Sequence, residues 1–443
     1  MLYNGAYQDL KLKLPMLSLE SHGPRVRCGL PLNKEFAYAF AVGAICTASG
    51  GLILGAGALQ SRVEAAELLP KSDFQIVFDG GSQMMVWMTL FWSMQHDRLG
   101  PRRCAVLGML ISSAGNLLLC VAMMLRSHDP YLYMLGYGLI GGGGNGVYVA
   151  GFQFVNLFDA KGLRTSVMAA GFNLSGMIYL VLNFEGLPLY AFFAFYFAYT
   201  LVISVALAIL FPDVPYGKGE QCVAVWPTRV CPQHWRDVLP DLSDIRICAS
   251  ALRQGRFWGF VLTFGWATLV NLWVAGAIFV IHPNAGTAFF KWGLPVISNM
   301  TFLFSPLFGA LVDRCGFSIP ALLLIISCQT VLLCLALDNP VAEWLTLISL
   351  VVLSSDAYTL QFAYVTMTFP VEMYPGLMTM TFFVQGILGF IAWPFLVNVR
   401  PFGNAWGIYI LFMLLPSVPL FLWPWFQAGH DRRARCAVDR EIN

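Results

Sequence analysis

Two short stretches of the chain, "SMQHDRLGPRR" (Ser93–Arg103) and "GALVDRCGF" (Gly309–Phe317), share the pattern small-x-x-x-Asp-Arg-x-Gly. Asp313 in the second copy follows Asp97 in the first by 216 residues, about half the length of the 443-residue chain. Each copy begins near the end of an apolar run, where hydrophobic residues give way to charged ones. The repeated pattern therefore indicates two related halves and marks the same structural position in each of them.

The composition indicates the surroundings in which these apolar runs fold. Hydrophobic residues make up 58% of the chain and charged residues only 11%, with a mean hydropathy of +0.68, whereas soluble domains carry about 25% charged residues. A membrane-spanning helix needs about 20 predominantly apolar residues. Twelve such runs are present, near 36–58, 79–95, 104–125, 131–158, 164–183, 188–211, 257–281, 292–311, 318–337, 344–369, 376–397 and 404–426. We therefore expect an all-α integral membrane protein with twelve transmembrane helices in two pseudo-symmetric six-helix halves.

The longest hydrophilic interruption, residues 212–256, separates six of these runs from the other six. The remaining connections are short, which favours antiparallel neighbouring helices. The sequence thus predicts an N-terminal tail (1–34), an N-terminal six-helix bundle (35–211), a linker (212–256), a C-terminal six-helix bundle (257–426) and a C-terminal tail (427–443).

The basic residues are distributed unevenly among the connections. If both termini lie on one side of the membrane, that side holds 21 of the 26 Lys and Arg residues. The other side holds the remaining five, which are Arg62, Lys71, Arg126, Lys291 and Arg400. Because positively charged loops stay in the cytoplasm, we expect cytoplasmic termini. The net charge of +2 is too small to indicate a nucleic-acid partner.

Cysteine and histidine, the residues most typical of catalytic and metal sites, do not show the spacing of such a site. The eleven cysteines fall in spans or in predicted cytoplasmic segments, and those of the linker lack the spacing of zinc ligands. The six histidines are scattered over both sides, and we find no phosphate-binding loop or nucleophile motif. We expect no metal, no cofactor and no enzymatic activity.

The repeated pattern resembles the signature of the major facilitator superfamily, Gly-x-x-x-Asp-Arg-x-Gly-Arg-Arg, which lies between the second and third helices of those transporters. In the first copy Ser93 replaces the first glycine, and the matching residues are Asp97, Arg98, Gly100, Arg102 and Arg103. The second copy lacks the basic pair and keeps Gly309, Asp313, Arg314 and Gly316. A third stretch, "VEMYPG" (Val371–Gly376), resembles the segment after the tenth helix in several branches. The resemblance implies a monomeric secondary transporter in a lipid bilayer.

The resemblance also implies a gating role for charged residues around these motifs. Ionic groups at helix ends can brace one conformation of a two-state protein and must separate in the other. The candidates are Asp97, Arg98, Asp159 and Arg164 in the first half, and Asp313, Arg314 and Glu372 in the second. An alternative interpretation is that the two motif arginines only fix the topology.

Several hydrogen-bonding side chains fall near the middle of the predicted spans. Burying an unpaired amide costs about 1–3 kcal/mol, and Asp at a helix centre costs about 2.5–3.5 kcal/mol on insertion scales. Such residues should face one another or a cavity, so we expect a shared central site with contributions from both halves. The predicted substrate-binding residues are Asn145, Tyr148, Asn173, Trp266, Asn271, Asn299, Asp356, Gln361 and Gln385.

Two features of this mid-depth set allow more than one interpretation. Asp356 could bind a substrate ammonium, carry a coupling proton, or bond neighbouring hydroxyl or amide groups. Four consecutive glycines, Gly141 to Gly144, precede Asn145 although each costs a helix about 1 kcal/mol relative to Ala. They allow either close helix packing or close approach of a ligand to the backbone.

The identity of the cargo depends on a narrower resemblance. The stretches "FVNLF" (Phe154–Phe158), "RTSVMAAGFNLSGMIYL" (Arg164–Leu180) and "FPDVPY" (Phe211–Tyr216) are similar to the solute carrier family 43 branch and its protozoan parasite relatives. That similarity implies a small-molecule substrate, a neutral or cationic amino acid, and a location in the plasma membrane, with an organelle membrane as the alternative. A coupling proton on Asp356 is a candidate additional ligand. Sugars, nucleobases or drugs are alternative cargoes, and a non-transporting membrane receptor is an alternative of another class.

Overall fold

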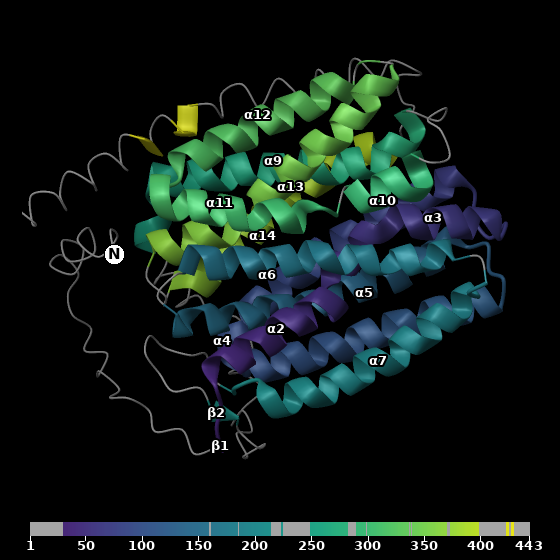
Figure 1. Cartoon of the computed structure of the whole chain (residues 1–443), viewed down its shortest axis with the longest axis horizontal. Coiled ribbons are helices and arrows are strands. Elements are labelled where there is room, and N and C mark those ends of the chain that lie inside the picture. The colour runs from purple at the N-terminus through teal and green to yellow at the C-terminus, as the bar shows by residue number, and fades with distance from the viewer. Residues whose placement is uncertain are drawn as a thin grey trace, which may run out of the picture.

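A computed structural model of the protein is almost entirely helical (Figure 1). It describes residues 30–158, 161–184, 186–213, 223–224, 249–281, 289–297, 299–335, 337, 339–369, 373–397, 422–424 and 427–428. Strand β1 (Leu30–Pro31) pairs antiparallel with β2 (Val223–Ala224). Most of both predicted tails, of the linker and of the twelfth span lie outside the described residues.

The helical elements follow the order of the predicted spans. The first half contains α2 (Lys34–Ala48), η1 (Gly50–Gly55), α3 (Ala56–Ala65), α4 (Lys71–Met124), α5 (Pro130–Gly151), η2 (Phe152–Leu157), α6 (Lys161–Ser175), η3 (Gly176–Asn183) and α7 (Leu189–Leu210). The second half contains α9 (Gly255–Ile281), η5 (Phe289–Gly293), α10 (Leu294–Ile297), α11 (Thr301–Cys315), α12 (Ser318–Leu335), α13 (Pro340–Thr368) and α14 (Tyr374–Val397).

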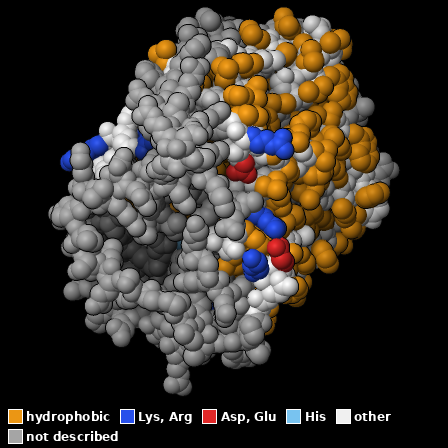
Figure 2. Space-filling model, turned by 60° about the vertical axis from the view of Figure 1, so that its left-hand side comes forward, with side chains coloured by type: hydrophobic (Ala, Val, Ile, Leu, Met, Phe, Trp, Pro, Cys, Tyr) orange, Lys and Arg blue, Asp and Glu red, His pale blue; other side chains and the backbone are white. Residues whose placement is uncertain are grey.

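Seven helical segments of the described part are long and apolar enough to cross a membrane. They are Lys34–Ala65, Leu99–Met124, Gly162–Asn183, Leu189–Leu210, Gly255–Ala275, Ser318–Leu335 and Pro340–Thr368. Hydrophobic side chains cover a wide area of the described surface (Figure 2), and on α7 Val202 is 67% exposed. Such a surface fits contact with lipid. The protein is therefore a multi-pass membrane protein, although the described residues do not show all twelve predicted spans.

The two copies of the repeated pattern adopt the same local backbone. Gly100 and Gly316 have φ angles of 78° and 79°, and they are the two glycines with positive φ in the described part of the chain. Gly100 interrupts α4 between its two spans, while Gly316 ends α11 and donates its N–H to Val312 O at 3.0 Å. Only glycine adopts this conformation without strain. The glycine of the pattern therefore makes the sharp turn between two spans in each half.

The glycine run of α5 allows close packing inside the first half. A Cβ added at Gly143 would lie 2.6 Å from Gly108 O of α4, and one added at Gly144 would lie 2.9 Å from Ala48 O. Real Cβ atoms do not approach backbone atoms this closely. The run therefore lets α5 meet the backbones of α4 and of the segment before η1, which supports the packing interpretation of the glycines.

Candidate transport site

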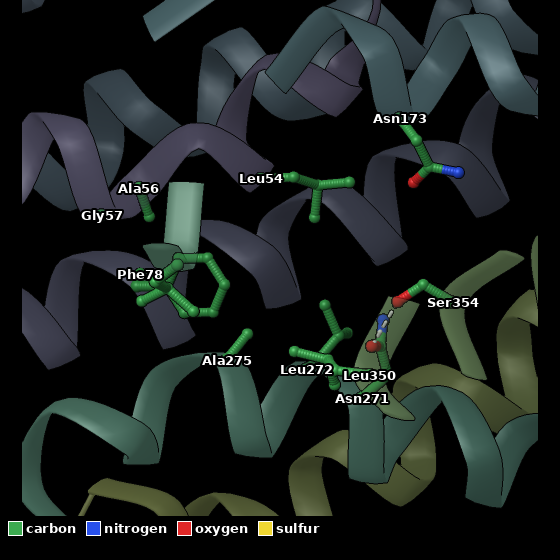
Figure 3. Close-up of a pocket in the computed structure, with 11 residues that line it drawn as sticks. Leu54, Ala56, Gly57, Phe78, Asn173, Asn271, Leu272, Ala275, Leu350 and Ser354 are labelled. Atoms are coloured by element: carbon green, nitrogen blue, oxygen red, sulfur yellow. Dashed lines mark hydrogen bonds between the residues drawn. The ribbon is translucent and has the colours of Figure 1, made fainter. Parts of the chain in front are cut away.

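A cavity of about 40 Å³ lies between the two halves, near the middle of the helices (Figure 3). Its lining includes Leu54, Phe78 and Asn173 from the first half and Asn271, Leu350 and Ser354 from the second. One water molecule needs about 10–15 Å³ of such a cavity. The cavity therefore has room for a few water molecules but not for an amino acid or a sugar. A solute of that size can enter only when the halves move apart.

Three polar side chains approach this cavity from both halves. Ser354 Oγ donates a hydrogen bond of 2.6 Å to Asn271 Oδ1, which joins α13 to α9 (Figure 3). Asn173 donates to Ala169 O of its own helix at 3.2 Å, so its amide oxygen is left for another donor. Asn173 and Asn271 are thus two predicted substrate-binding residues that the fold brings to one cavity. No charged side chain belongs to the lining that the structure describes.

Asp356 lies on a different face of α13 from Ser354, which lines the cavity. It follows Ser354 by two residues, and successive residues of an α-helix are about 100° apart, so its side chain points about 200° away from that of Ser354. The residue is fully buried, and neither carboxylate oxygen has a hydrogen-bond partner among the described residues. This position disfavours direct contact between Asp356 and a substrate ammonium in the cavity.

Other predicted residues contact neighbouring helices rather than this cavity. Asn145 donates to Thr89 Oγ1 of α4 at 2.5 Å and packs beside Gly50, entirely within the first half. Asn299 donates to Leu54 O at 3.5 Å and so connects the halves. Trp266, Gln361 and Gln385 are buried or partly buried and also lie outside the cavity lining. A common depth in the membrane therefore does not bring all these side chains to one place.

Aromatic rings from both halves pack together next to the cavity. Tyr148 lies 4.5 Å from Phe172 and 5.1 Å from Phe362 between ring centroids. Phe152 stacks on Phe362 at 4.0 Å, and Tyr358 lies 5.4 Å from Phe172. Tyr358 and Phe362 follow the cavity residue Ser354 by one and two helical turns. This aromatic layer therefore separates the cavity from the helix ends that carry Asp97 and Asp313, which we call the motif end.

A further contact between the halves lies at the motif end itself. Asp313 Oδ2 of α11 accepts a hydrogen bond of 3.2 Å from Leu163 N, in the first turn of α6. Gly162 leaves room for the carboxylate, since a Cβ there would lie 2.6 Å from Asp313 Cγ. Partial burial raises the pKa of Asp313, and the hydrogen bond from Leu163 opposes that rise. The position at a helix N-terminus also favours the negatively charged carboxylate. The predicted gating residue Asp313 thus joins the halves.

The other predicted gating residues divide into two groups. Arg164 pairs with Glu35 at 3.2 Å and lies over the rings of Tyr38 and Phe158 at 4.8 and 4.2 Å, all within the first half. Arg314 is exposed. The side chains of Asp97 and Arg98, and the residues Asp159 and Glu372, lie outside what the structure describes. The gating role of the candidates in the first half therefore stays a prediction.

Two further ionisable groups, one in the first half and one directly after it, were not predicted from the sequence. Asp213, after α7, pairs with the buried Arg102 at 3.0 Å. Asp79 of α4 is a second buried carboxylate, at 6% exposure, next to the cavity residue Phe78. A signal for Asp79 existed, because it stands at the beginning of the second apolar run. The partner of Arg102 is 111 residues away in the chain, so only the fold reveals it.

Comparisons with known proteins identify the fold. No protein-family model matches the chain, and no curated protein sequence matches it. The crystal structure of a mutant of the nucleoside transporter NupG matches with a TM-score of 0.58 and 13% identity, over 89% of this chain and all of the other. At that identity the likeness shows the fold alone. The chain has a transporter fold of the major facilitator type. None of the comparisons supports the solute carrier family 43 branch.

Proposed function

We propose that this protein is a monomeric secondary transporter, not an enzyme, and that it moves a small polar organic solute by alternating access. The observation that carries the proposal is the mid-depth cavity with polar side chains from both halves. Alternating access requires a site between two bodies and contacts that close one side and then break. The aromatic layer and the contact of Asp313 with Leu163 are suited to close one side of the site and to separate again.

The sequence resemblance implies a neutral or cationic amino acid, and of these two the cargo that we propose is a neutral amino acid. The lining offers amides and a hydroxyl, and its described part contains no charged group that would pair with a cationic side chain. A nucleoside is the second candidate, because the matched transporter carries nucleosides. Both solutes present hydrogen-bond donors and acceptors that Asn173, Asn271 and Ser354 could satisfy.

We also propose that the motif end faces the cytoplasm, with both termini there, and that the membrane is the plasma membrane. The proposed orientation rests on the distribution of Lys and Arg among the connections, and the proposed plasma membrane rests on the resemblance to amino-acid carriers. Asp356 is our candidate for the site of a coupling proton, because it is fully buried and its face of α13 is remote from the cavity. Ionisable groups inside membrane bundles often serve proton relays.

Uptake by purified protein in liposomes tests the proposed function. Labelled L-leucine, L-lysine, uridine and D-glucose would be offered with and without an inward proton gradient, with protein-free liposomes as the blank. We expect uptake of L-leucine or uridine above the blank, and gradient-stimulated uptake that Asp356→Asn abolishes while exchange of labelled for unlabelled solute persists. Binding without uptake would favour a receptor, and neither binding nor uptake by folded protein would contradict the proposal.

Loss of the Asn271 amide is expected to weaken solute binding. Asn271→Ala leaves Ser354 without its acceptor and removes a polar group from the cavity. A lost hydrogen bond of this kind costs about 1–2 kcal/mol, or about 5- to 30-fold in affinity. We expect KM for the transported probe to rise by about that factor. Thr330→Val, on the exposed face of α12, is the control, and an unchanged KM in Asn271→Ala would remove this residue from the site.

Replacement of Asp313 is expected to slow transport through the motif end. Asp313→Ala removes the acceptor for Leu163 N, an interaction worth about 1 kcal/mol at a helix N-terminus, so the closed arrangement should become about fivefold less populated. We expect the initial uptake rate to fall by about that factor. Asp313→Asn keeps an acceptor oxygen and separates the hydrogen bond from the charge. A wild-type rate in Asp313→Ala would mean that this contact does not govern closure.

A further inference from the structure

Buried polar atoms without hydrogen-bond partners gather where α4, α9 and α14 pack against one another. Gln83 and Gln385 are 8% and 7% exposed. Among the described residues no partner exists for the Oε1 atoms of these two side chains, for Trp87 Nε1 or for Thr268 Oγ1. Leaving one buried polar group unsatisfied costs about 1–3 kcal/mol. Four such groups at one junction call for an explanation that packing alone does not give.

Contacts between α4 and α14 place three of these side chains close together. The Trp87 ring lies 6.3 Å from Phe383 and 5.2 Å from Phe390, over Gly386, where an added Cβ would lie 2.7 Å from the ring. Gln83 precedes Trp87 by one turn and covers Gly389, where a Cβ would lie 2.5 Å from Gln83 Cδ. Residues four apart on a helix are neighbours on its surface, so Gln385 lies within one turn of the position that Gln83 covers.

Helix α9 connects this junction with the central cavity. Thr268 is three and four residues before Asn271 and Leu272, both of which line the cavity, and it shares their face of the helix. Gly265, three residues before Thr268, faces α14, since a Cβ there would contact Leu388 at 3.0 Å and Gln385 at 4.0 Å. Asn271, Thr268 and Gly265 thus follow one another along α9, and Gly265 faces Gln385 of α14.

We propose that Gln83, Trp87, Thr268 and Gln385 form a second part of the substrate site, the α4–α14 subsite, for a neutral solute that carries both hydrogen-bond donors and acceptors. This inference rests on the proposed transport function. The amide oxygens accept, the indole N–H donates, and the Thr268 hydroxyl does both. Helix α4 belongs to one half and α9 and α14 to the other, so the junction opens when the halves separate. The solute then supplies the hydrogen bonds that the closed protein lacks.

Two substitutions that keep shape and remove polarity test the subsite. Trp87→Phe keeps an aromatic ring against α14 and removes the N–H group, and Gln385→Met keeps the length of the side chain. Trp258→Phe is the matched control, because the Trp258 indole donates to Leu252 O at 2.7 Å on an exposed part of α9. Uptake of labelled L-leucine and uridine into liposomes gives KM, and thermal unfolding without solute gives Tm. Gln83→Met replaces either variant that does not fold.

The expected result is a five- to tenfold rise in KM for the transported probe in Trp87→Phe and Gln385→Met, with Tm unchanged or raised. Tm should not fall, because an unsatisfied polar group has been removed from the solute-free protein. Trp258→Phe should leave KM within twofold of the wild type. KM values within twofold of the wild type in the subsite variants would overturn the subsite while transport stands. A wild-type protein that takes up neither probe would instead overturn the transport proposal and the subsite with it.

Discussion

Gly144→Ala is expected to destabilise the first half severely, whereas Gly141→Ala, three residues earlier on the same helix, should be tolerated. A Cβ at position 144 would overlap the backbone between Ala48 and Gly50, with Ala48 O only 2.9 Å away. Backbone atoms there can yield only if α2 and η1 shift as well. At Gly141 the added Cβ meets two methyl carbons of Ile53 at 3.1 Å and Met85 Cβ at 3.3 Å. These are side-chain atoms, and a rotation of Ile53 with a shift of a few tenths of an ångström at Met85 can relieve the contacts.

The expected magnitudes follow from the same two environments. Overpacking of a rigid site costs about 1–3 kcal/mol and occasionally more, and we expect Gly144→Ala to reach the upper end of that range. Gly141→Ala gains about 1 kcal/mol of helix propensity, which offsets its tighter contact. Thermal unfolding of both purified variants, with the yield of monodisperse protein, measures the difference. If Gly144→Ala unfolds at the wild-type temperature, α5 and the segment before η1 do not pack as closely as described.

The glycine run also shows why its role could not be read from the sequence. Close packing and ligand approach require the same small residues, and the pattern Gly141 to Gly144 is equally compatible with both. Which of the two interpretations holds depends on the residues that pack against the glycine run, namely Gly50 in the first span and Ser112 in the third. These partners are distant in the chain, so only the tertiary structure distinguishes the two interpretations.

The repeated pattern predicted the structure better than the glycine run did, because the turn at its glycine depends only on the local backbone conformation. A positive φ at Gly100 and Gly316 is needed wherever a helix must stop and the chain must reverse within a few residues. Two copies 216 residues apart therefore predicted two equivalent turns and, with the apolar runs, the transporter fold. The finer branch within that fold had no comparable local requirement, and no comparison supports it.

The central site was predicted in part for a related reason. The depth of a residue along a span can be counted in the sequence, and it suggested a shared site for Asn173 and Asn271, both of which line the cavity. The direction of a side chain around the helix axis could not be counted, because helices that are apolar on all sides show no preferred face. Ser354 and Asp356 illustrate the consequence, since the cavity receives the serine and not the nearby carboxylate.

Asp213→Ala is expected to give the largest loss of stability among substitutions at the surface of the first half. Arg102 is enclosed by the end of α7: its Nη1 lies 3.0 Å from Asp213 Oδ1, its Nε donates to Phe211 O at 2.7 Å, and its backbone N–H donates to Pro212 O at 3.1 Å. The Arg102 side chain is 7% exposed and that of Asp213 is 24% exposed. Without the carboxylate, the buried guanidinium keeps its charge and loses its ion pair with Asp213.

Breaking a buried ion pair by removing one partner costs about 3–5 kcal/mol, and the partial exposure of Asp213 places our expectation near 3 kcal/mol. Replacing both partners by apolar residues is often much less costly, so Arg102→Met combined with Asp213→Ala should recover part of the loss. Thermal unfolding of the two single variants and the double variant completes a double-mutant cycle. A loss in the double variant equal to the sum of the two single losses would show that the two groups do not interact. A recovery in the double variant would show that the loss of the ion pair with Asp213, and not a missing packing contact, weakens the junction between α7 and the turn at Gly100.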